Sequence, residues 1–358
     1  MKKRSDKYRR HRSFLLSLTT TTVLTLGIAS SISGPSHADE TGVSFWLPGL
    51  FGSLAAVPQQ PGWSLTVINY YDSVGASGAV AAEREIAIGK FSAAVNVNLS
   101  VSESSKVDLG LINPNYTFAT PVFGGQLQVG LMAIVGTNNT SLDGTLTLSG
   151  PGGGAIMRQG SISQTTTGFG DLYPDVMIRW NSGVNNWMVY ATGDIPVGDY
   201  SSTNLANLGI GHGAVDAGGG YTYFNPLTGH EISAVTGFTY NFVNPSTSYQ
   251  SGVDWHLDWG ASQFLSKQIF VGAVGYFYEQ VSPDNGCVPQ LCPFESGVIG
   301  IGPQLGFIIP VGSVQTYINL KGYYEFAAHD RPSGWNAWLT LSFSPSPATN
   351  PKSAMVTK

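Results

Sequence analysis

The side chains that could carry acid–base chemistry lie at alternate positions of one short stretch. Asp254, His256 and Asp258 share a face if that stretch is extended, because successive side chains of a strand point to opposite faces. A histidine beside a carboxylate suits a Ser-His-acid hydrolase, for which His230 and His212 are the rival histidines. No G-x-S-x-G motif accompanies them, so we predict structural histidines and no catalytic residue. The other interpretation is a pore lined by opposed charges.

The same inspection predicts no cofactor and no metal. The glycine runs at 152–154 and 218–220 lack the lysine and the strand-to-helix context of a phosphate loop. No His and Cys cluster has the spacing of metal ligands. Cys287 and Cys292 lie in a loop with Pro and Gly, and in an oxidising periplasm they should pair, which stabilises the loop by only about 2 kcal/mol. A redox or metal-binding pair is the alternative, but its usual spacing is different.

Residues 314–326, VQTYINLKGYYEF, show the clearest alternation in the chain. One face carries Val314, Thr316, Ile318, Leu320, Gly322, Tyr324 and Phe326, and the other carries Gln315, Tyr317, Asn319, Lys321, Tyr323 and Glu325. A helix would leave no apolar stripe, since Leu320, Lys321 and Glu325 would then be neighbours. A polar face with a cation and an anion suits either the surface of a soluble sandwich or the inside of a membrane barrel.

Thirteen segments with this alternation follow one another between residues 63 and 343. They include 91–102 and 107–119, the second interrupted at Asn113-Pro114, which indicates a bulge. Short turns alternate with long connections, and the longest, the Gly-, Ser- and Thr-rich stretch 137–168, predicts an external loop. Outer-membrane barrels have short periplasmic turns, long external loops and an even number of strands. We therefore predict about 12 strands, with 14 as the alternative.

The N-terminus has the three parts of a secretory signal peptide. Seven Lys and Arg residues precede an apolar stretch, 14–28, and a small-residue cleavage site at Ser36-His37-Ala38. A membrane anchor is the alternative, but threonines at 19–22 dilute the apolar stretch, which is short for a span. Residues 39–61 have no clean alternation and are expected to form a periplasmic lead-in, a lumen plug or an extra strand.

Removal of residues 1–38 makes the chain strongly acidic. Of the 17 Lys and Arg and the 22 Asp and Glu, seven basic residues and one acidic residue lie in that stretch, which leaves 10 against 21. This balance excludes the basic footprint of a nucleic-acid-binding protein. Charged residues are sparse, and no later stretch reaches the roughly 18 apolar residues of a membrane helix. An exported chain of this kind points to a β-barrel in the bacterial outer membrane.

The predicted fold is therefore all-β: a transmembrane, antiparallel, up-and-down β-barrel over residues 62–343. Residues 1–38 are predicted to be a signal peptide cleaved near Ala38, and residues 344–358 a tail beyond Phe343, the aromatic residue at which assembly machinery often recognises a barrel. Aromatic residues expected at the two membrane interfaces are Trp180, Trp187, Tyr240, Trp255, Trp259, Tyr276, Tyr324 and Trp335.

Inward-facing residues are predicted to line the lumen of this barrel. They are Asp171, Asp175, Arg179, Asp194, Glu231, Asp254, His256, Asp258, Tyr317, Lys321, Tyr323 and Glu325. Opposed charges in this set would shape passage through a pore. Alternatively, they would form an ion-pair network that holds a narrow barrel shut.

Several ordered motifs resemble a known family. The first is GFGDLYP at 168–174, and the densest is TGDIPVGDY at 192–200, which continues through Asn204 to Gly209. Further likeness lies at 221–229, 244–258, 274–280, 302–306 and 326–338. On these motifs, over most of the chain after the signal peptide, the sequence resembles the MetA-pathway of phenol degradation family of predicted outer-membrane barrels.

The resemblance implies a barrel encoded near aromatic-degradation genes, with a role in the uptake of aromatic or other hydrophobic compounds. The expected function is a passive outer-membrane channel and not an enzyme. Its expected partners are outer-membrane lipids, small hydrophobic or aromatic solutes, periplasmic chaperones and the barrel-assembly machinery. The alternatives are a closed structural or adhesive barrel that acts through its external loops, and a lipid-modifying barrel enzyme.

Overall fold

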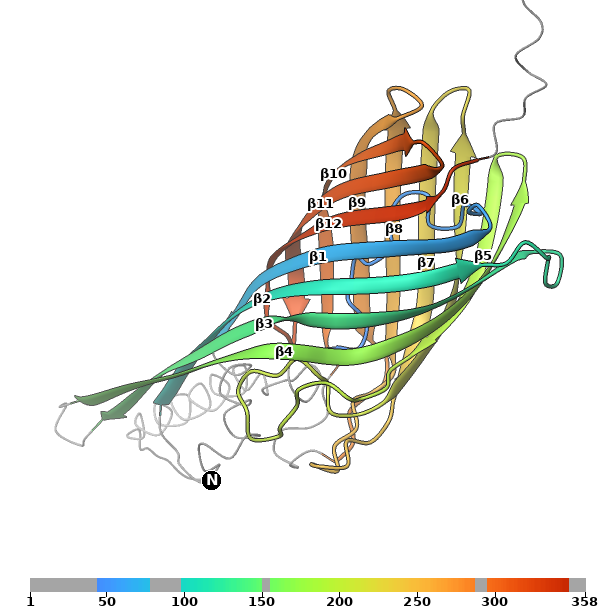
Figure 1. Ribbon diagram of the computed structural model, residues 1–358. Helices are drawn as coiled ribbons and strands as arrows, with labels where there is room; N and C mark the ends of the chain where they lie inside the picture. Colours follow the sequence, from blue (N-terminus) through green and yellow to red (C-terminus); the bar gives the residue numbers. More distant parts are fainter. Residues whose placement is uncertain (1–43, 78–97, 150–154, 287–294, 348–358) are drawn as a thin grey trace, which may run out of the picture. The chain divides into compact units, whose positions relative to one another are not determined.

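Alternating side chains build the wall of a closed barrel. The computed structural model describes residues 44–77, 98–149, 155–286 and 295–347. Within these ranges twelve antiparallel strands pair with their sequence neighbours, and β1 pairs with β12 to close the wall (Figure 1). The strands are β1 (Gly62–Ser77), β2 (Asn98–Thr117), β3 (Gln126–Ser149), β4 (Ala155–Ser182), β5 (Asn185–Gly193), β6 (Ala214–Asn225), β7 (His230–Asn241), β8 (Asp254–Phe264), β9 (Ile269–Gln280), β10 (Gly297–Val311), β11 (Val314–His329) and β12 (Ser333–Pro345).

The predicted all-β, antiparallel, up-and-down barrel of 12 strands is confirmed. On β11 the outward Leu320 and Tyr324 are 52% and 68% exposed, whereas Lys321 and Tyr323 on the other face are buried. This period of two sorts apolar side chains to the outside and polar ones to the inside along the strand. Closure matters because it removes the sheet edges, whose unpaired backbone groups could not be exposed to lipid.

A belt of apolar side chains covers the outside of the wall. Among its exposed members are Leu65, Ile112, Val129, Val176, Val189, Ile232, Phe238, Val271, Phe277, Ile301, Leu320 and Leu339. A continuous apolar surface of this extent indicates contact with acyl chains and not with water. No helix in the described part of the chain is long and apolar enough to cross a membrane.

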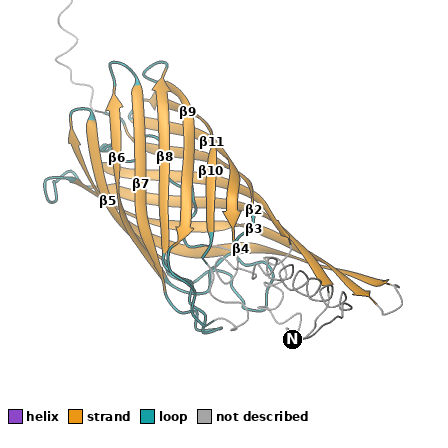
Figure 2. Ribbon diagram, turned by 180° about the vertical axis from the view of Figure 1, so that it is seen from behind, coloured by secondary structure: helices purple, strands orange, loops and turns teal. Residues whose placement is uncertain are grey.

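Short turns gather at one end of the barrel, which we call the turn end, and longer connections at the other, the loop end (Figure 2). The turn end holds 183–184, 226–229 and 312–313, and the loop end holds 194–213 and 242–253. In outer-membrane barrels the end with short turns faces the periplasm.

A single strand, β2, forms where the sequence predicted two. The predicted segments were 91–102 and 107–119, and their residues 98–102 and 107–117 belong to β2, whereas 91–97 lie outside the described residues. The polar residues between them look like a turn in sequence, but Ser105 pairs with both neighbouring strands and its hydroxyl contacts Asn138 and Thr140 at 3.3 and 3.1 Å. The bulge predicted at Asn113-Pro114 is also wrong, because the register with β1 continues unchanged through both residues.

The long loop predicted at 137–168 is wrong as well, because most of it is strand. The ends of β3 and β4 pair in continuous register, and cross-strand contacts join the polar side chains: Thr137 and Thr167 hydroxyls are 2.9 Å apart. Ser, Thr and Asn side chains that suggest a loop in sequence are thus satisfied across a hairpin. Tyr276 was predicted to lie at a membrane interface, and this prediction is wrong because Tyr276 is fully buried inside the barrel.

Some predicted features lie outside the described residues. They are the signal peptide at 1–38, the glycine run at 152–154, the pair Cys287 and Cys292, and the tail from 348 onward.

Leu320→Arg should lower the free energy of unfolding by about 2–4 kcal/mol, because it places a cation on the lipid-facing side of β11. Denaturant titration of the protein folded in lipid vesicles measures this change. Leu227→Arg is the control, since Leu227 is 95% exposed in a turn, and its effect should stay within about 0.5 kcal/mol. Equal effects at the two sites would show that the belt does not face lipid.

Candidate functional site

An irregular segment occupies the middle of the barrel. Residues 44–61, called the inner segment below, precede β1, contribute no strand and bond to inward-facing side chains of the wall. Because the inner segment has no strand partner, its backbone groups that do not bond within the segment need acceptors and donors from the wall. Leu54 N donates to Glu231 Oε1 at 2.9 Å. Nearer the turn end, Gln59 and Gln126 exchange two hydrogen bonds of 2.7 and 2.6 Å.

Two buried charges hold one turn of the inner segment. Asp258 on β8 accepts hydrogen bonds from Gly49 N at 2.8 Å and from Phe51 N at 3.0 Å. Lys321 Nζ on β11 donates to the successive carbonyl oxygens of residues 49–51, at 2.6, 3.2 and 3.4 Å. Only 1% of Asp258 and 3% of Lys321 is exposed, so backbone dipoles replace water around each charge. We call this arrangement the charge clamp.

Gly49 is required for the charge clamp on steric grounds. Its φ of +90° lies in the left-handed region that favours glycine. An added Cβ would also lie 3.0 Å from the ring of Tyr323 and 3.2 Å from the ring of Tyr276. The turn can therefore approach the wall closely only because this residue has no side chain.

An aromatic stack anchors the upstream part of the inner segment. The ring of Trp46 lies parallel to the ring of His256, with centroids 3.7 Å apart. His256 Nε2 is 3.0 Å from Asp216 Oδ2 and 3.3 Å from the hydroxyl of Tyr190. The structure thus brings a carboxylate, a phenol and an indole to His256, and among the described residues no serine hydroxyl bonds to it. The hydrolase arrangement considered for this histidine is not assembled around it.

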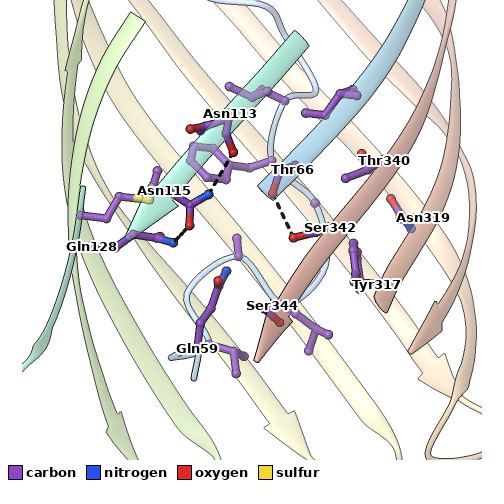
Figure 3. Close-up of a pocket in the computed structure, with 18 of the residues that line it drawn as sticks. Gln59, Thr66, Asn113, Asn115, Gln128, Tyr317, Asn319, Thr340, Ser342 and Ser344 are labelled. Atoms are coloured by element: carbon purple, nitrogen blue, oxygen red, sulfur yellow. Dashed lines mark hydrogen bonds between the residues drawn. The ribbon is translucent and has the colours of Figure 1, made fainter. Parts of the chain in front are cut away.

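The lumen holds a cavity of about 360 Å³ between the charge clamp and the turn end. Figure 3 shows polar side chains converging on it from several strands. Thr66 Oγ1 donates to Ser342 Oγ at 2.9 Å, and Gln128 Nε2 donates to Asn115 Oδ1 at 2.5 Å. Rings and apolar chains complete the lining, among them Ile68, Met132, Tyr173, Met177, Ile308 and Tyr317. The cavity therefore offers both hydrogen-bonding groups and apolar surface.

Arg179 brings a buried guanidinium to this cavity. Its Nε donates to Ala55 O of the inner segment at 3.3 Å, and its Nη1 donates to Gln128 Oε1 at 2.5 Å. Its Nη2 lies 3.2 Å from Met177 Sδ. Only 5% of the residue is exposed, so water does not compensate its charge.

A connection at the loop end is tied to Asp171. The two oxygens of Asp171 accept hydrogen bonds from Gly198 N at 2.7 Å and Ile210 N at 2.8 Å. A register shift between Ala133 and Val135, where β3 faces β4, changes which positions of β4 point inward. Phe169 before the shift is 69% exposed, and Asp171 after it is buried.

The twelve residues predicted to line the lumen fall into three groups. Asp175, Arg179, Tyr317 and Lys321 line the cavity. Glu231, His256, Asp258, Lys321 and Tyr323 contact the inner segment. The others bind near the loop end: Asp171 and Asp194 at the connection 194–213, Asp254 to Asn241 Nδ2 at 2.9 Å, and Glu325 to the Tyr276 hydroxyl at 2.7 Å.

Sequence reasoning missed the amides and hydroxyls of the cavity. Asn113, Asn115, Gln128 and Ser342 carry no charge and stand in segments whose neighbours also alternate, so nothing in the sequence separates them from other polar positions. Trp46 was missed for another reason: the inner segment has no periodicity that predicts where its side chains point. The polar residues on either side of Pro114 are the one signal that favoured a shared inward face.

A closed antiparallel barrel of twelve strands, apolar outside and polar at many inward positions, defines the class of outer-membrane β-barrels. Residues 86–341 match the family described as "Putative MetA-pathway of phenol degradation". Because this match spans more than half of the chain, the protein belongs to that family, as its motifs predicted. No curated protein matches the chain in sequence.

Solved structures resemble the chain to different degrees. The crystal structure of the COG4313 outer membrane channel from Pseudomonas putida F1 has a TM-score of 0.56 and 13% sequence identity, covering 81% of this chain and 96% of that one. A Pseudomonas aeruginosa FadL homologue matches with a TM-score of 0.36 and 10% identity, covering 87% of this chain and 98% of that one. The first similarity supports the barrel fold independently of the family.

Asp258→Asn should release the charge clamp, because an amide has one acceptor oxygen for two backbone donors and leaves the Lys321 charge uncompensated. We expect the free energy of unfolding to fall by about 1.5–3 kcal/mol. We also expect more frequent and larger openings in planar bilayers. Asp143→Asn, at an exposed position of β3, is the matched control. Recordings of the Asp258 variant that match those of the wild type would contradict a holding role for the charge clamp.

Asp194 should make stability depend on pH. It follows β5 at the start of the connection 194–213, and burial together with the nearby Asp171 carboxylate raises its pKa to about 8. The folded state therefore binds a proton that the unfolded state has released, so stability should fall as pH rises from about 4 to 8. Asp194→Asn should remove this decrease, measured as the unfolding midpoint between pH 5 and 9. Parallel curves for variant and wild type would contradict the assignment.

Proposed function

We propose that the protein is an outer-membrane channel for the passive uptake of small hydrophobic or aromatic compounds. The observation that carries the proposal is the cavity of about 360 Å³ inside the lumen, which combines aromatic and apolar lining with a few hydrogen-bonding groups. Pockets that hold small organic molecules have this size and mixture. The family's description refers to phenol degradation, and the Pseudomonas putida protein of the same fold is described as an outer membrane channel.

The proposal includes export and assembly. A signal peptide at 1–38 would direct the chain across the inner membrane, and periplasmic chaperones with the barrel-assembly machinery would insert it. Cys287 and Cys292 would form a disulfide in that compartment. The environment of His256, covered by Trp46 and bonded to Asp216, supports a structural role for this histidine and a protein that is not an enzyme.

Passage would require the inner segment to move. Trp46 and Phe51 pack with Tyr190 in the middle of the lumen, above the cavity, so a solute from the loop end meets them first. The charge clamp, the Trp46 stack and the other hydrogen bonds to the wall hold the segment by non-covalent contacts, each reversible. Displacement of the segment would join the loop end to the cavity.

A closed structural barrel is the second candidate, and the charge clamp is the observation that favours it. Its two buried charges satisfy the backbone of the inner segment well enough to hold it permanently. The two functions differ in one consequence: a channel loses its activity when the inner segment is locked to the wall, and a closed barrel has no such activity to lose.

A disulfide between the inner segment and the wall tests the channel. The hydroxyl oxygens of Ser53 and Ser262 are 2.6 Å apart, so sulfur atoms in their places would be within bonding reach. Cells with Ser53→Cys/Ser262→Cys should take up labelled toluene several-fold more slowly than wild-type cells under oxidising conditions. A reductant should restore the uptake.

The control is Ser262→Cys alone, with and without the reductant, and wild-type cells treated in the same way. A strain that lacks the gene sets the background. Uptake in that strain equal to the wild-type rate would overturn the channel, and uptake by the locked variant equal to wild type would overturn the movement of the inner segment.

A further inference from the structure

We propose that the cavity near the turn end binds aromatic carboxylates, with the Arg179 guanidinium as the group that holds the carboxylate. The inference rests on the proposed channel and names the class of solute that its cavity selects. It follows from the charge, the unused donors and the rings of the lining residues.

Arg179 has hydrogen-bond capacity that the protein does not use. A guanidinium has five N–H donors, and the described contacts occupy three of them: one on Nε, one on Nη1 and one, to a sulfur atom, on Nη2. One N–H on each Nη atom is left. Two such donors on neighbouring nitrogens match the two oxygens of a carboxylate, which is the geometry of a bidentate pair.

No carboxylate among the described residues forms an ion pair with Arg179, although the Asp175 carboxylate on the same strand interacts electrostatically with its charge. Ion pairs such as His256 with Asp216 and His329 with Glu279 do not include Arg179. A buried cation without a bonded anion is costly, and an anionic solute would remove that cost. Asp175, on the same strand, accepts a hydrogen bond from Asn113 Nδ2 at 3.4 Å.

The few donors left free at the cavity suit an anion of single charge. Among the described lining residues the charged ones are Asp175, Arg179 and Lys321, two cations and one anion. Lys321 has Asp258 as its counter-charge and gives all three of its donors to the inner segment, so it adds no binding group to the cavity. A dianion such as phosphate would need more unspent donors than Arg179 offers.

The other side of the cavity suits a ring. Tyr173, Tyr317, Met132 and Met177 line it, and sulfur and aromatic groups contact aromatic rings favourably. Figure 3 shows Tyr317 facing the cavity opposite Asn113 and Asn115. A volume of about 360 Å³ accommodates a one-ring solute with its head group. Hydroxyl-rich solutes such as sugars would leave these apolar walls without a matching surface.

Binding of benzoate to the purified full-length protein in detergent tests the proposal, with benzamide as the neutral probe of the same shape. Isothermal calorimetry should show benzoate bound at least about tenfold more tightly than benzamide, the size expected for a charge-assisted pair. Arg179→Met should remove this preference, and Arg179→Lys should retain part of it. Lys267→Met, which removes the same charge from an exposed turn at the same end, should leave the preference unchanged.

The comparison of the two probes on the wild-type protein needs no variant, so it decides the matter even if Arg179→Met does not fold. Equal affinity for benzoate and benzamide would overturn the proposal, and so would a folded Arg179→Met protein that keeps the preference. Toluene uptake that depends on the protein, together with no preference for benzoate, would overturn this inference and leave the channel standing. Loss of both would overturn the channel as well.

Discussion

Asp258 and Lys321 face the same three residues of backbone inside the barrel, one offering acceptors and the other donors. A segment threaded through a closed barrel cannot pair with a strand edge, because closure has used every edge. Those of its N–H and C=O groups that do not bond within the segment are therefore satisfied by side chains, and a carboxylate and an ammonium are the strongest partners available. Each charge in turn is tolerated in the interior because the segment's dipoles surround it.

This dependence explains how the rest of the lumen is arranged. Where the inner segment runs, wall residues such as Glu231 turn toward it, and Trp46 covers His256. Where the segment lies close to the turn end and covers less of the wall, amides and hydroxyls bond to one another and enclose the cavity. The outward side chains of the same strands that form the belt are apolar, because the belt contacts only acyl chains.

The wall of this barrel and its inward positions were predictable from sequence, and the contacts of the inner segment were not. Alternation has a fixed period, so the outward face of β11 and the inward positions of Lys321 and Glu325 follow from spacing alone. The polar stretches of β2 and of the β3–β4 hairpin were read as loops, because a hydroxyl that bonds across strands looks the same in sequence as one that bonds to water.

The charge clamp depends on contacts between residues about 200 positions apart, which no local pattern reports. Gly49 shows the limit well: its importance comes from the rings of Tyr276 and Tyr323, and these come together only once β9 and β11 have paired with β10. The change at Asp171 in which positions of β4 point inward is hidden in the same way, because it results from a register shift against β3.

The central claim is that the inner segment is held in the lumen by backbone bonds to two wall charges. Hydrogen exchange of the Gly49 and Phe51 amides, resolved by residue in the detergent-solubilised protein, measures this directly. If Asp258 holds both amides, they should exchange as slowly as amides in the strands of the wall, and far faster once Asp258 is neutralised. Fast exchange of both amides in the native protein would contradict the account.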